Sequence, residues 1–252
     1  NEIVMIVLVD IGNSQIKVAI SKNANLSRIK NFSLKDLYLV KKYFIDICNK
    51  EKSSLFYSSV SSNNFEKKFR NITNSIFTKV TQFKSTKSFL TVKNAYKTPN
   101  KLGSDRWSQV VGAHMIYKSN TMIVSCGSVI SVDYVTSKGS HKGGILLSGA
   151  NRYTKCFFDI DNLKDIKLTR KTKPSLNVIE RTTAKQISTG YELMISSSIN
   201  KIYSELNRES GQDVLLLLTG SYAADISNIV AKNKIIEPHF VLKSLSVIEN
   251  YI

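Results

Sequence analysis

The chain has 252 residues, of which 42% are hydrophobic and 9% aromatic, a composition that excludes a disordered tail, a collagen-like repeat and a small disulfide-stabilised scaffold. Its length allows one large domain or two small ones, each able to bury a hydrophobic core. The 36 Lys and Arg against 19 Asp and Glu give a net charge of +17, which raises the question of a polyanionic partner such as nucleic acid or an anionic membrane.

The cysteines and the apolar first segment indicate where the protein works. Cys48, Cys126 and Cys156 are an odd number without metal-ligand spacing, which favours a reducing compartment and no zinc site. The apolar stretch Ile3–Val9 runs into Asp10. It is too short to span a membrane and lacks the cleavage pattern of a signal peptide, so we expect a buried strand of a cytoplasmic protein that has no contact with a membrane.

The first half of the chain alternates strand and helix patterns. After the first strand, the turn-like Ile11–Ser14 leads into the alternating, β-branched Ile16–Ile20, which predicts a β-hairpin. The further predicted elements are a strand over Asn25–Phe32, a helix over Leu34–Ile47, strands over Leu55–Val60 and Ser75–Val80 with a polar helix between them, and a helix over Ser104–Lys118. This order is typical of an α/β layer architecture.

The second half opens with the same pattern, 115 residues later. Thr121–Val124 is apolar, a turn with Gly127 follows, and Val129–Val135 alternates again. The remaining predicted elements are a strand over Gly143–Leu147, a helix over Thr182–Asn207, a buried strand over Asp213–Leu218, a final helix over Tyr222–Lys232 and a short strand near Ile235 or Phe240. We therefore expect two duplicated half-domains, residues 1–118 and 119–252.

The turn after the first strand has the residues of a phosphate-binding loop. Gly12 lets a phosphate approach the backbone, Asn13 and Ser14 can donate hydrogen bonds, and Asp10 can hold Mg²⁺ through water. Lys17 on the outgoing strand supplies a cation. The alternative is a hairpin in which these residues only make the turn. The second glycine turn at the same place in the repeat favours a phosphate clamp.

The two later glycine turns are chemically weaker. Ser125 stands where the first turn has its Asp, so Gly127 and Ser128 can bind phosphate but this turn cannot hold a hard cation strongly. Gly220 follows a buried strand and precedes a helix, where backbone N–H groups can point at a nucleotide. A simple strand-to-helix turn capped by Ser221 explains these residues equally well.

A polar loop precedes the helix predicted at Ser104, and its residues could act on a substrate. Asp105 can accept a proton from a hydroxyl, as a carboxylate does in phosphoryl transfer. Arg106 can bind a substrate carboxylate through two hydrogen bonds. Alternatively, Asp105 is an acid favoured by the helix dipole, or the two residues form an ordinary salt bridge.

Together these segments resemble the type III pantothenate kinases, a family of the acetate kinase, sugar kinase, Hsp70 and actin superfamily. The matching segments follow the family's order, with the Tyr96–Arg106 loop the most specific: Asp10 to Lys17, Ser58-Ser59-Val60, Tyr96 to Arg106 with Gly112-Ala113, Gly143-Gly144-Ile145, Thr183 to Gly190, Thr219-Gly220 and Glu237 to Leu242. The resemblance implies two ribonuclease H-like, actin-like half-domains with mixed five-stranded sheets and an active site in the cleft between them.

The resemblance also implies the reaction, ATP-dependent phosphorylation of the hydroxyl of pantothenate to 4'-phosphopantothenate, the first step of coenzyme A biosynthesis. Asp105 would be the general base, Asp10 would hold Mg²⁺ through water, and the enzyme would be a homodimer. The implied ATP-binding residues are Asp10, Ile11, Gly12, Asn13, Ser14, Gln15, Ile16, Lys17, Gly127, Ser128 and Gly220. The implied pantothenate-binding residues are Tyr96, Gly103, Ser104, Asp105, Arg106 and Thr183.

The chain departs from the family pattern in its second half. The family has an Asp that binds a monovalent cation such as K⁺ or NH₄⁺ where this chain has Ser125. We therefore expect activation by K⁺ to be weak or absent, unless other oxygens rebuild the site. Ser221 replaces a family glycine and Ser148 a family proline, and both changes bear on nucleotide affinity.

Two other functions compete with the kinase. A non-catalytic regulatory relative could bind a partner or nucleic acid, but Asp10, Asp105 and Arg106 are all present, which favours an active enzyme. Another kinase or phosphatase of the superfamily would lack the Gly103–Arg106 segment. Only seven of the 36 basic residues are Arg, and they are scattered, so we interpret the net charge as a solvated lysine surface that attracts two anionic substrates, with nucleic acid an unlikely partner.

Overall fold

The computed structural model describes residues 5–23, 25–48, 53–157, 160, 163, 179–230 and 233–252. The chain divides into two compact units, one made of Asn1–Ile116 with His239–Ile252 and the other of Tyr117–Pro238. Within the described ranges, we find no helix with the length and apolarity needed to cross a membrane.

The first unit is built on a mixed five-stranded sheet with the order β3-β2-β1-β4-β5. Its strands are β1 (Met5–Ile11), β2 (Gln15–Lys22), β3 (Asn25–Ser33), β4 (Ser53–Ser59) and β5 (Lys79–Phe83). β1 is antiparallel to β2 and parallel to β4. The predicted hairpin is therefore confirmed, although Ile3 and Val4 of the predicted first strand lie outside the described residues.

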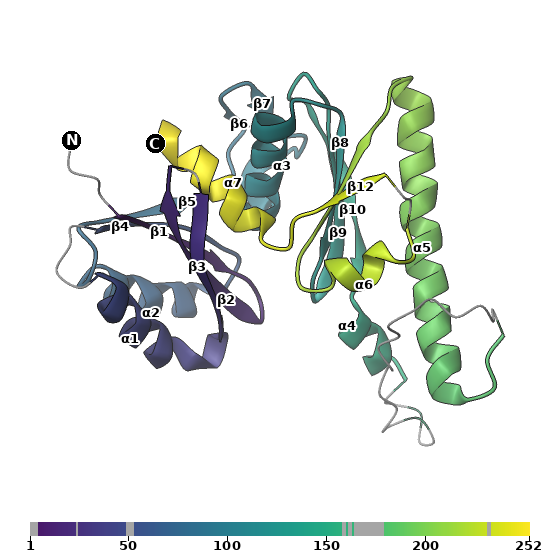
Figure 1. The fold of residues 1–252 in the computed structure, drawn as a ribbon, viewed down its shortest axis with the longest axis horizontal. Helices are drawn as coiled ribbons and strands as arrows, with labels where there is room; N and C mark the ends of the chain where they lie inside the picture. Colours follow the sequence, from purple (N-terminus) through teal and green to yellow (C-terminus); the bar gives the residue numbers. More distant parts are fainter. Residues whose placement is uncertain are drawn as a thin grey trace. The chain divides into compact units, whose positions relative to one another are not determined.

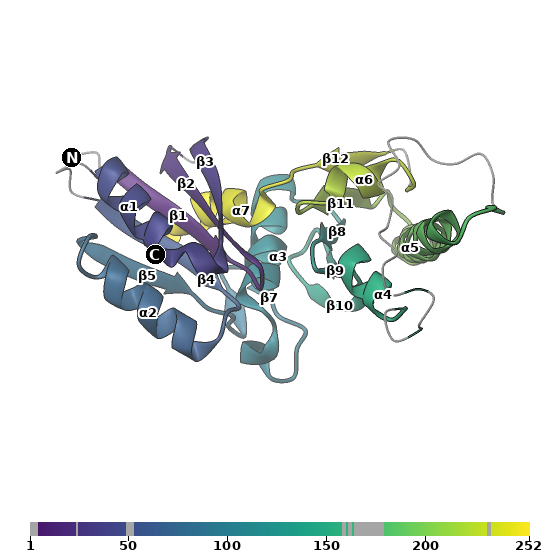
Figure 2. The same cartoon turned by 90° about the horizontal axis from the view of Figure 1, so that it is seen from below.

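Helices cover both faces of this sheet (Figures 1 and 2). They are α1 (Leu37–Cys48), α2 (Asn63–Thr73), α3 (Ser104–Tyr117) and α7 (Phe240–Ile248), with short 3₁₀ turns η1 (Leu34–Asp36), η2 (Pro99–Lys101) and η4 (Glu249–Tyr251) and a small hairpin of β6 (Ser88–Phe89) and β7 (Val92–Lys93). Alternate residues of β1 point to opposite faces, so Val7 and Val9 pack with Phe44 of α1 and Phe69 of α2. The face of β1 that carries Leu8 is left for α7.

The second unit repeats the strand order of the first, β10-β9-β8-β11-β12. Its strands are β8 (Thr121–Cys126), β9 (Val129–Val135), β10 (His141–Ser148), β11 (Leu215–Thr219) and β12 (Lys234–Ile236), and its helices are α4 (Ala150–Lys155), α5 (Thr183–Ser210) and α6 (Ala223–Ser227). The two mixed five-stranded sheets expected from the sequence are thus confirmed.

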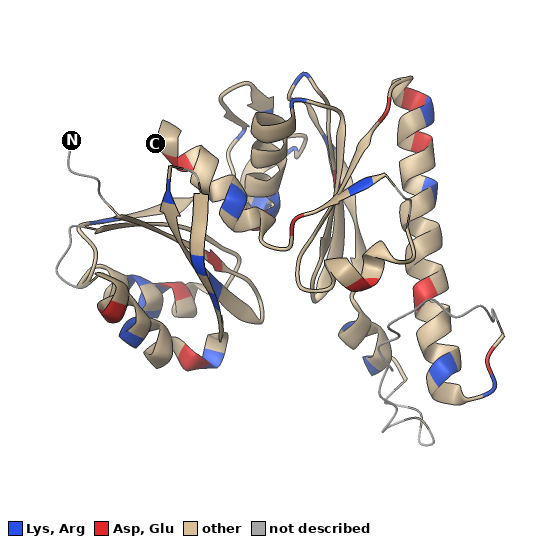
Figure 3. Cartoon of the chain, viewed as in Figure 1, with Lys and Arg blue, Asp and Glu red and all other residues tan. Residues whose placement is uncertain are grey.

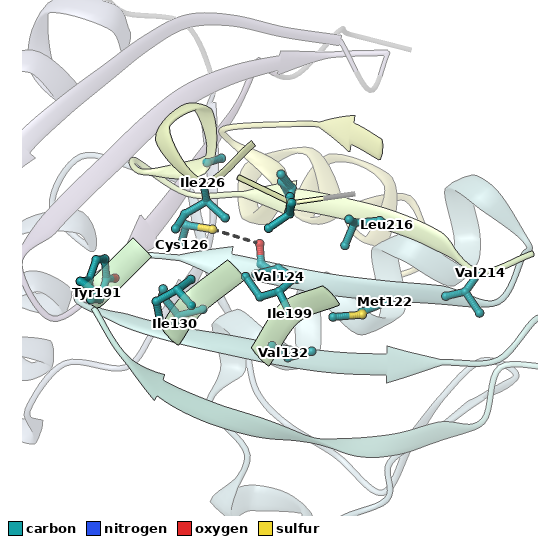
Figure 4. Close-up of a cluster of buried hydrophobic side chains, with 14 residues drawn as sticks. Met122, Val124, Cys126, Ile130, Val132, Tyr191, Ile199, Val214, Leu216 and Ile226 are labelled. Carbon is teal, nitrogen blue, oxygen red and sulfur yellow. Dashed lines mark hydrogen bonds between the residues drawn. The ribbon is translucent and has the colours of Figure 1, made fainter. Parts of the chain in front are cut away.

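The core of the second unit lies between its sheet and α5 (Figure 4). Met122, Val124 and Cys126 alternate along β8 toward this side, and Tyr191 and Ile199 of α5 pack against them. The Cys126 thiol also donates a long hydrogen bond to the Val124 carbonyl, at 3.7 Å. The predicted long helix is therefore confirmed, and it exists because its apolar stripe has this sheet to bury against.

The sequence placed two elements wrongly. A strand was expected over Ser75–Val80, but the chain turns after α2, where the Thr73 carbonyl accepts from the backbone N–H of Phe77 at 2.9 Å, and β5 begins only at Lys79. The helix expected over Tyr222–Lys232 is the short α6, with Lys232 outside the described residues. The short strand expected near Ile235 or Phe240 is confirmed at Ile235, in β12, whereas Phe240 begins α7, a helix that was not predicted.

The C-terminal helix also belongs to a different unit than the predicted boundary at residue 119 implied. α7 packs against β1, β2, β3 and β4 of the first sheet, so the chain returns to the first unit after finishing the second. Gly112 of α3 permits a close approach, because a Cβ there would overlap Ser244 of α7. The glycine therefore sits where two helices of the first unit come together.

Candidate active site

The turn between β1 and β2 is held by backbone hydrogen bonds. Gly12 donates to the carbonyl of Gln15 at 3.0 Å, and Val60, just after β4, donates to the carbonyl of Ile11 at 3.0 Å. Asp10 lies opposite Lys17 in the β1–β2 register. The end of β1 is thus fixed from both neighbouring strands, with a carboxyl and an ammonium group across from each other.

Asp10 is in an unusual electrostatic environment. Its side chain belongs to a residue only 8% exposed, and burial raises its pKa from 3.8 to about 7. Lys17 lowers the pKa and Asp105 raises it, both by less than burial does. The two carboxyl groups therefore sense each other although they lie far apart in the sequence, and Asp10 would gain from a further cation.

The folded chain does not itself require glycine at the first turn. Gly12 has no positive φ, and a Cβ there would meet only the Gln15 carbonyl at an ordinary 3.5 Å. Gly127 in the second unit has the same surroundings, with the Val129 carbonyl at 3.5 Å. The fold therefore does not require glycine at Gly12 or Gly127, and the missing side chain leaves room for a ligand to approach the backbone there.

The other residues of the first turn divide into exposed and buried ones. Asn13, Ser14 and Gln15 are exposed, so their side chains can reach a ligand. Ile11 and Ile16 are fully buried in the core. Of the ATP-binding residues that the resemblance implied, these two can therefore offer only backbone groups.

Ser104 fixes the start of α3 against the end of β4. Its hydroxyl lies 2.9 Å from the Ser58 hydroxyl, accepts from the Ser59 backbone N–H at 3.2 Å and contacts the Ser59 carbonyl at 2.9 Å. This bonding holds the adjacent Asp105 near the end of the sheet, where Asp10 also lies. The sequence contained the Ser58-Ser59 pair only as part of a resemblance, and its positioning role is visible only in the fold.

The Asp105 carboxylate is folded back over its own loop. Its Oδ1 accepts from the Arg106 backbone N–H at 2.7 Å. A Cβ at Gly103 would lie 2.5 Å from this same oxygen, so glycine leaves the space that the carboxylate occupies. A larger residue at position 103 would collide with the Asp105 carboxylate in this arrangement.

Arg106 and Tyr96 form a pair beside that carboxylate. The Arg106 guanidinium donates to the Tyr96 hydroxyl at 3.0 Å and lies 5.8 Å from the ring centroid. The Tyr96 backbone N–H is held in turn by the Asn94 side chain at 3.0 Å. Asn94 was not singled out in the sequence, and an Asn two residues before a tyrosine is too common a pattern to have revealed this role.

The turn after β8 is enclosed by two glycines. Gly220 has φ +92°, and a Cβ there would lie 2.5 Å from the Cys126 carbonyl oxygen. Gly149 crosses the same turn, where a Cβ would lie 2.6 Å from the Ser128 carbonyl oxygen. Gly127 and Ser128 thus lie together with Gly220, as the sequence suggested. Gly149 was missed, since a lone glycine after a strand indicates only a turn.

The remaining candidates in the second unit are Thr183 and Ser125. Thr183 is exposed at the first position of α5. Ser125 lies opposite Ser131 of β9 and Thr219 of β11 in the sheet register, so its nearest partners are hydroxyl residues. Within the described ranges, no group of three or more His, Cys, Asp or Glu side chains could hold a metal ion.

Comparisons with known proteins relate this arrangement to one family. The sequence profile described as type III pantothenate kinase matches residues 6–205. The type III pantothenate kinase of Azoarcus sp. is 26% identical over 157 residues, which cover 62% of this chain. That of Teredinibacter turnerae is 24% identical over 256 residues, covering 97% of this chain and 98% of the relative. The chain spans only 57–61% of the length of the first three curated relatives it matches.

Solved structures show the same fold at low identity. A conserved Baf family protein from Campylobacter jejuni has a TM-score of 0.62 at 18% identity, covering 97% of this chain and 98% of the other. MreB5 of Spiroplasma citri, bound to ADP, has a TM-score of 0.54 at 11% identity, covering 100% of this chain and 98% of the other. The expected actin-like ATPase fold is thereby confirmed.

Proposed function

The chain belongs to the type III pantothenate kinase family, and we propose that it transfers the γ-phosphate of ATP to the hydroxyl of pantothenate, giving 4'-phosphopantothenate at the start of coenzyme A biosynthesis. The observation that carries this proposal is the electrostatic coupling of Asp10 and Asp105 within one unit, with Lys17 beside Asp10. Two carboxylates and a cation beside a glycine turn are the groups that phosphoryl transfer from a nucleotide to an alcohol needs.

The first turn would hold the ATP phosphates. The open space beside Gly12 would let a phosphate approach the turn closely, Asn13 and Ser14 would add side-chain donors, and Lys17 would add a positive charge. Gly127, Ser128 and Gly220 are the corresponding groups of the second unit and stay predicted nucleotide-binding residues. These groups bind and orient the phosphates, which is the largest part of catalysis in this class of reaction.

The surroundings of Asp10 fit a magnesium ion. The carboxylate is buried, and its raised pKa shows that Lys17 does not compensate the cost of its negative charge. Mg²⁺ is commonly bound through one or two carboxylates together with substrate phosphates and waters, so a lone Asp suffices. When bound with ATP, Mg²⁺ would neutralise charge that develops on the transferred phosphoryl group.

The residues at the start of α3 would bind and activate pantothenate. Asp105 would accept the proton of the attacking hydroxyl as general base. Arg106, held by Tyr96, would bind the pantothenate carboxylate through charge-assisted hydrogen bonds. Gly103 and Ser104 would shape the same pocket by their backbone. Thr183, at the start of α5 in the second unit, stays a predicted pantothenate-binding residue.

A monovalent-cation site in the second unit fits poorly. Ser125 and its register partners Ser131 and Thr219 offer neutral oxygens without the carboxylate that the family uses there. Neutral hydroxyl oxygens compensate the lost hydration of a cation less well than a carboxylate does. We therefore propose that K⁺ or NH₄⁺ takes no essential part in this enzyme.

The distribution of charge supports anionic substrates. The first unit contains 20 of the 36 basic residues but only 8 of the 19 acidic ones, a net charge of +12, against +5 for the second unit. Figure 3 shows lysines and arginines over α1, α2 and the sheet of the first unit. Such a field raises the local concentration of ATP and pantothenate near the candidate residues. The homodimer implied by the family remains a prediction.

The proposed function is tested by pantothenate-dependent ADP release from MgATP. The wild type should turn over, and Asp105→Asn should lose about 100- to 10,000-fold in kcat, the range typical of a general base. Asp36→Asn, which changes an exposed acid of η1 in the same unit, should retain full activity. Equal, background-level rates in wild type and Asp105→Asn would contradict the proposal.

A further inference from the structure

The second unit contains a cavity of about 830 Å³ away from its glycine turn. It opens at the start of β8, where Asn120 contributes to its lining, whereas Ser125 and the turn lie at the other end of that strand. Five residues of strand separate the two places by about 17 Å. The volume falls within the range of about 300–1,000 Å³ that is usual for small-molecule sites.

The cavity exists because β10 leaves space beside α5. The pairing of β9 with β10 is irregular between His141 and Gly144. Gly143, at φ +100°, has nothing within 4 Å of the place where a Cβ would be. Gly143 therefore puts no side chain into the cavity that it lines, and the space beside it stays open to a ligand.

One wall of the cavity is apolar and partly aromatic. It is formed by side chains of β9, β10 and α5, namely Val132, Tyr134, Ile145, Ile202 and Leu206. Ile145 is 46% exposed, so a ligand can reach it. A ligand with an apolar or aromatic body would remove this wall from water.

The floor of the cavity is an ordered set of hydrogen bonds. Asn120 donates to the Gln212 side chain at 3.2 Å and accepts from the Ser137 backbone N–H at 2.9 Å. Burial raises the pKa of the Tyr134 hydroxyl, which also hydrogen-bonds Ser210. The polar groups at this end of the sheet are therefore fixed in place before any ligand arrives, which lowers the entropic cost of binding.

The charges at the rim are asymmetric. Lys138 and Lys142 line the cavity together with a single acid, Glu209. Both lysines are exposed, and in the part of the chain that the structure describes neither makes an ion pair with a carboxylate. The two ammonium groups of Lys138 and Lys142 therefore lie beside apolar lining residues, and they favour binding of a negatively charged group.

From this combination we propose that the cavity is a second ligand site, which binds a small organic anion with an apolar or aromatic body. Its carboxylate or phosphate group lies between Lys138 and Lys142, and its body lies against Tyr134 and Leu206. This site is distinct from the groups proposed to hold ATP and pantothenate, so it does not depend on the proposed reaction.

The test uses 4-phenylbutyrate as the probe and 4-phenylbutanol as its neutral match, with binding to the full chain measured by saturation-transfer NMR titration. The acid should bind more tightly than the alcohol. Lys142→Gln should weaken binding of the acid about two- to five-fold, the range for one partly exposed charge pair, without changing binding of the alcohol. Lys41→Gln, on α1 in the first unit, is the matched control and should have no effect.

Two variants that fill the cavity complete the test. Leu206→Trp and the more exposed Ile145→Trp should each abolish probe binding while the kinase rate stays unchanged. Thermal unfolding shows whether each variant is folded. If Leu206→Trp does not fold, Ile145→Trp still tests the proposal. Equal affinity for acid and alcohol would overturn the proposal. Probe binding that survives in a folded Trp variant would also overturn it. A Trp variant whose mass in sedimentation is half that of the wild type would overturn it as well, because this face would then be an interface between two copies.

Discussion

Replacing Asp10 by Asn should make the ligand-free protein more stable at neutral pH while removing a group proposed for catalysis. Asp10 is buried, and its pKa is raised from 3.8 to about 7. Asn keeps the shape and never carries the charge. The groups that face this carboxyl are Lys17, which favours the charged form, and Asp105, which disfavours it, and the variant leaves both in place.

The magnitude follows from the difference between the two pKa values. Below about pH 4 the carboxyl is protonated in both the folded and the unfolded state, so it has no effect on stability. As the pH rises the unfolded chain loses this proton first, so the folded state is progressively destabilised until the pH passes about 7. The difference of about three units corresponds to about 4 kcal/mol at high pH, of which about 2 to 3 kcal/mol develops between pH 5 and pH 8.

Urea unfolding of wild type and Asp10→Asn at pH 5, 6, 7 and 8, without nucleotide or Mg²⁺, measures this effect. The advantage of the variant should grow by about 2 to 3 kcal/mol over that range. Asp36→Asn at an exposed position is the control and should show no comparable growth. An advantage that stays constant with pH, or a wild type that is the more stable protein at pH 8, would refute the assignment of a desolvated carboxyl.

Gly220→Ala should lower the free energy of unfolding by about 1–3 kcal/mol because Gly220 has a positive φ. Gly12→Ala should change the free energy of unfolding by less than about 1 kcal/mol and should instead raise KM for ATP. Equal losses of the two variants in urea unfolding would contradict this contrast. Tyr96→Phe removes a 3.0 Å hydrogen bond from Arg106 and should raise KM for pantothenate about two- to ten-fold with little change in kcat. A loss confined to kcat would speak against the proposed binding role. Replacing K⁺ by tetramethylammonium should leave the wild-type rate within about two-fold, because Ser125 offers no carboxylate, and Ser125→Asp should introduce a dependence on K⁺. A wild type that requires millimolar K⁺ would exclude this interpretation.

The parts of the fold that the sequence predicted are those with a clear period. Alternation over Ile16–Ile20 and the long apolar stripe of α5 each permit one structure, and both are found. The helix from Phe240 to Ile248 was not predicted, because a short buried run has no period that separates a strand from a helix. Only the exposed face of the first sheet, which is distant in sequence, decides that this run becomes α7.

The same limit applies to the candidate site. The start of α3 at Ser104 was predicted, because a loop with Gly103 followed by acidic and apolar residues is a local signal. The coupling of Asp10 with Asp105 is not local, since it depends on β4 lying between β1 and the loop. The close passage of Gly149 over the second turn depends in the same way on tertiary structure, so single-residue reasoning could not have found it.

The return of α7 to the first unit has a consequence for biosynthesis. A ribosome releases the first unit's five strands long before residues 240–248, and until then this sheet lacks the helix that packs against β1 to β4. Phe240, Leu242 and Leu245 are fully buried in the finished protein, so the helix is needed to close that core. Domains generally fold in the order of their synthesis, but here the earlier unit is completed last. Messages truncated before the codons for Phe240–Ile248 should therefore yield a first unit that lacks α7 and exposes apolar side chains to chaperones and proteases.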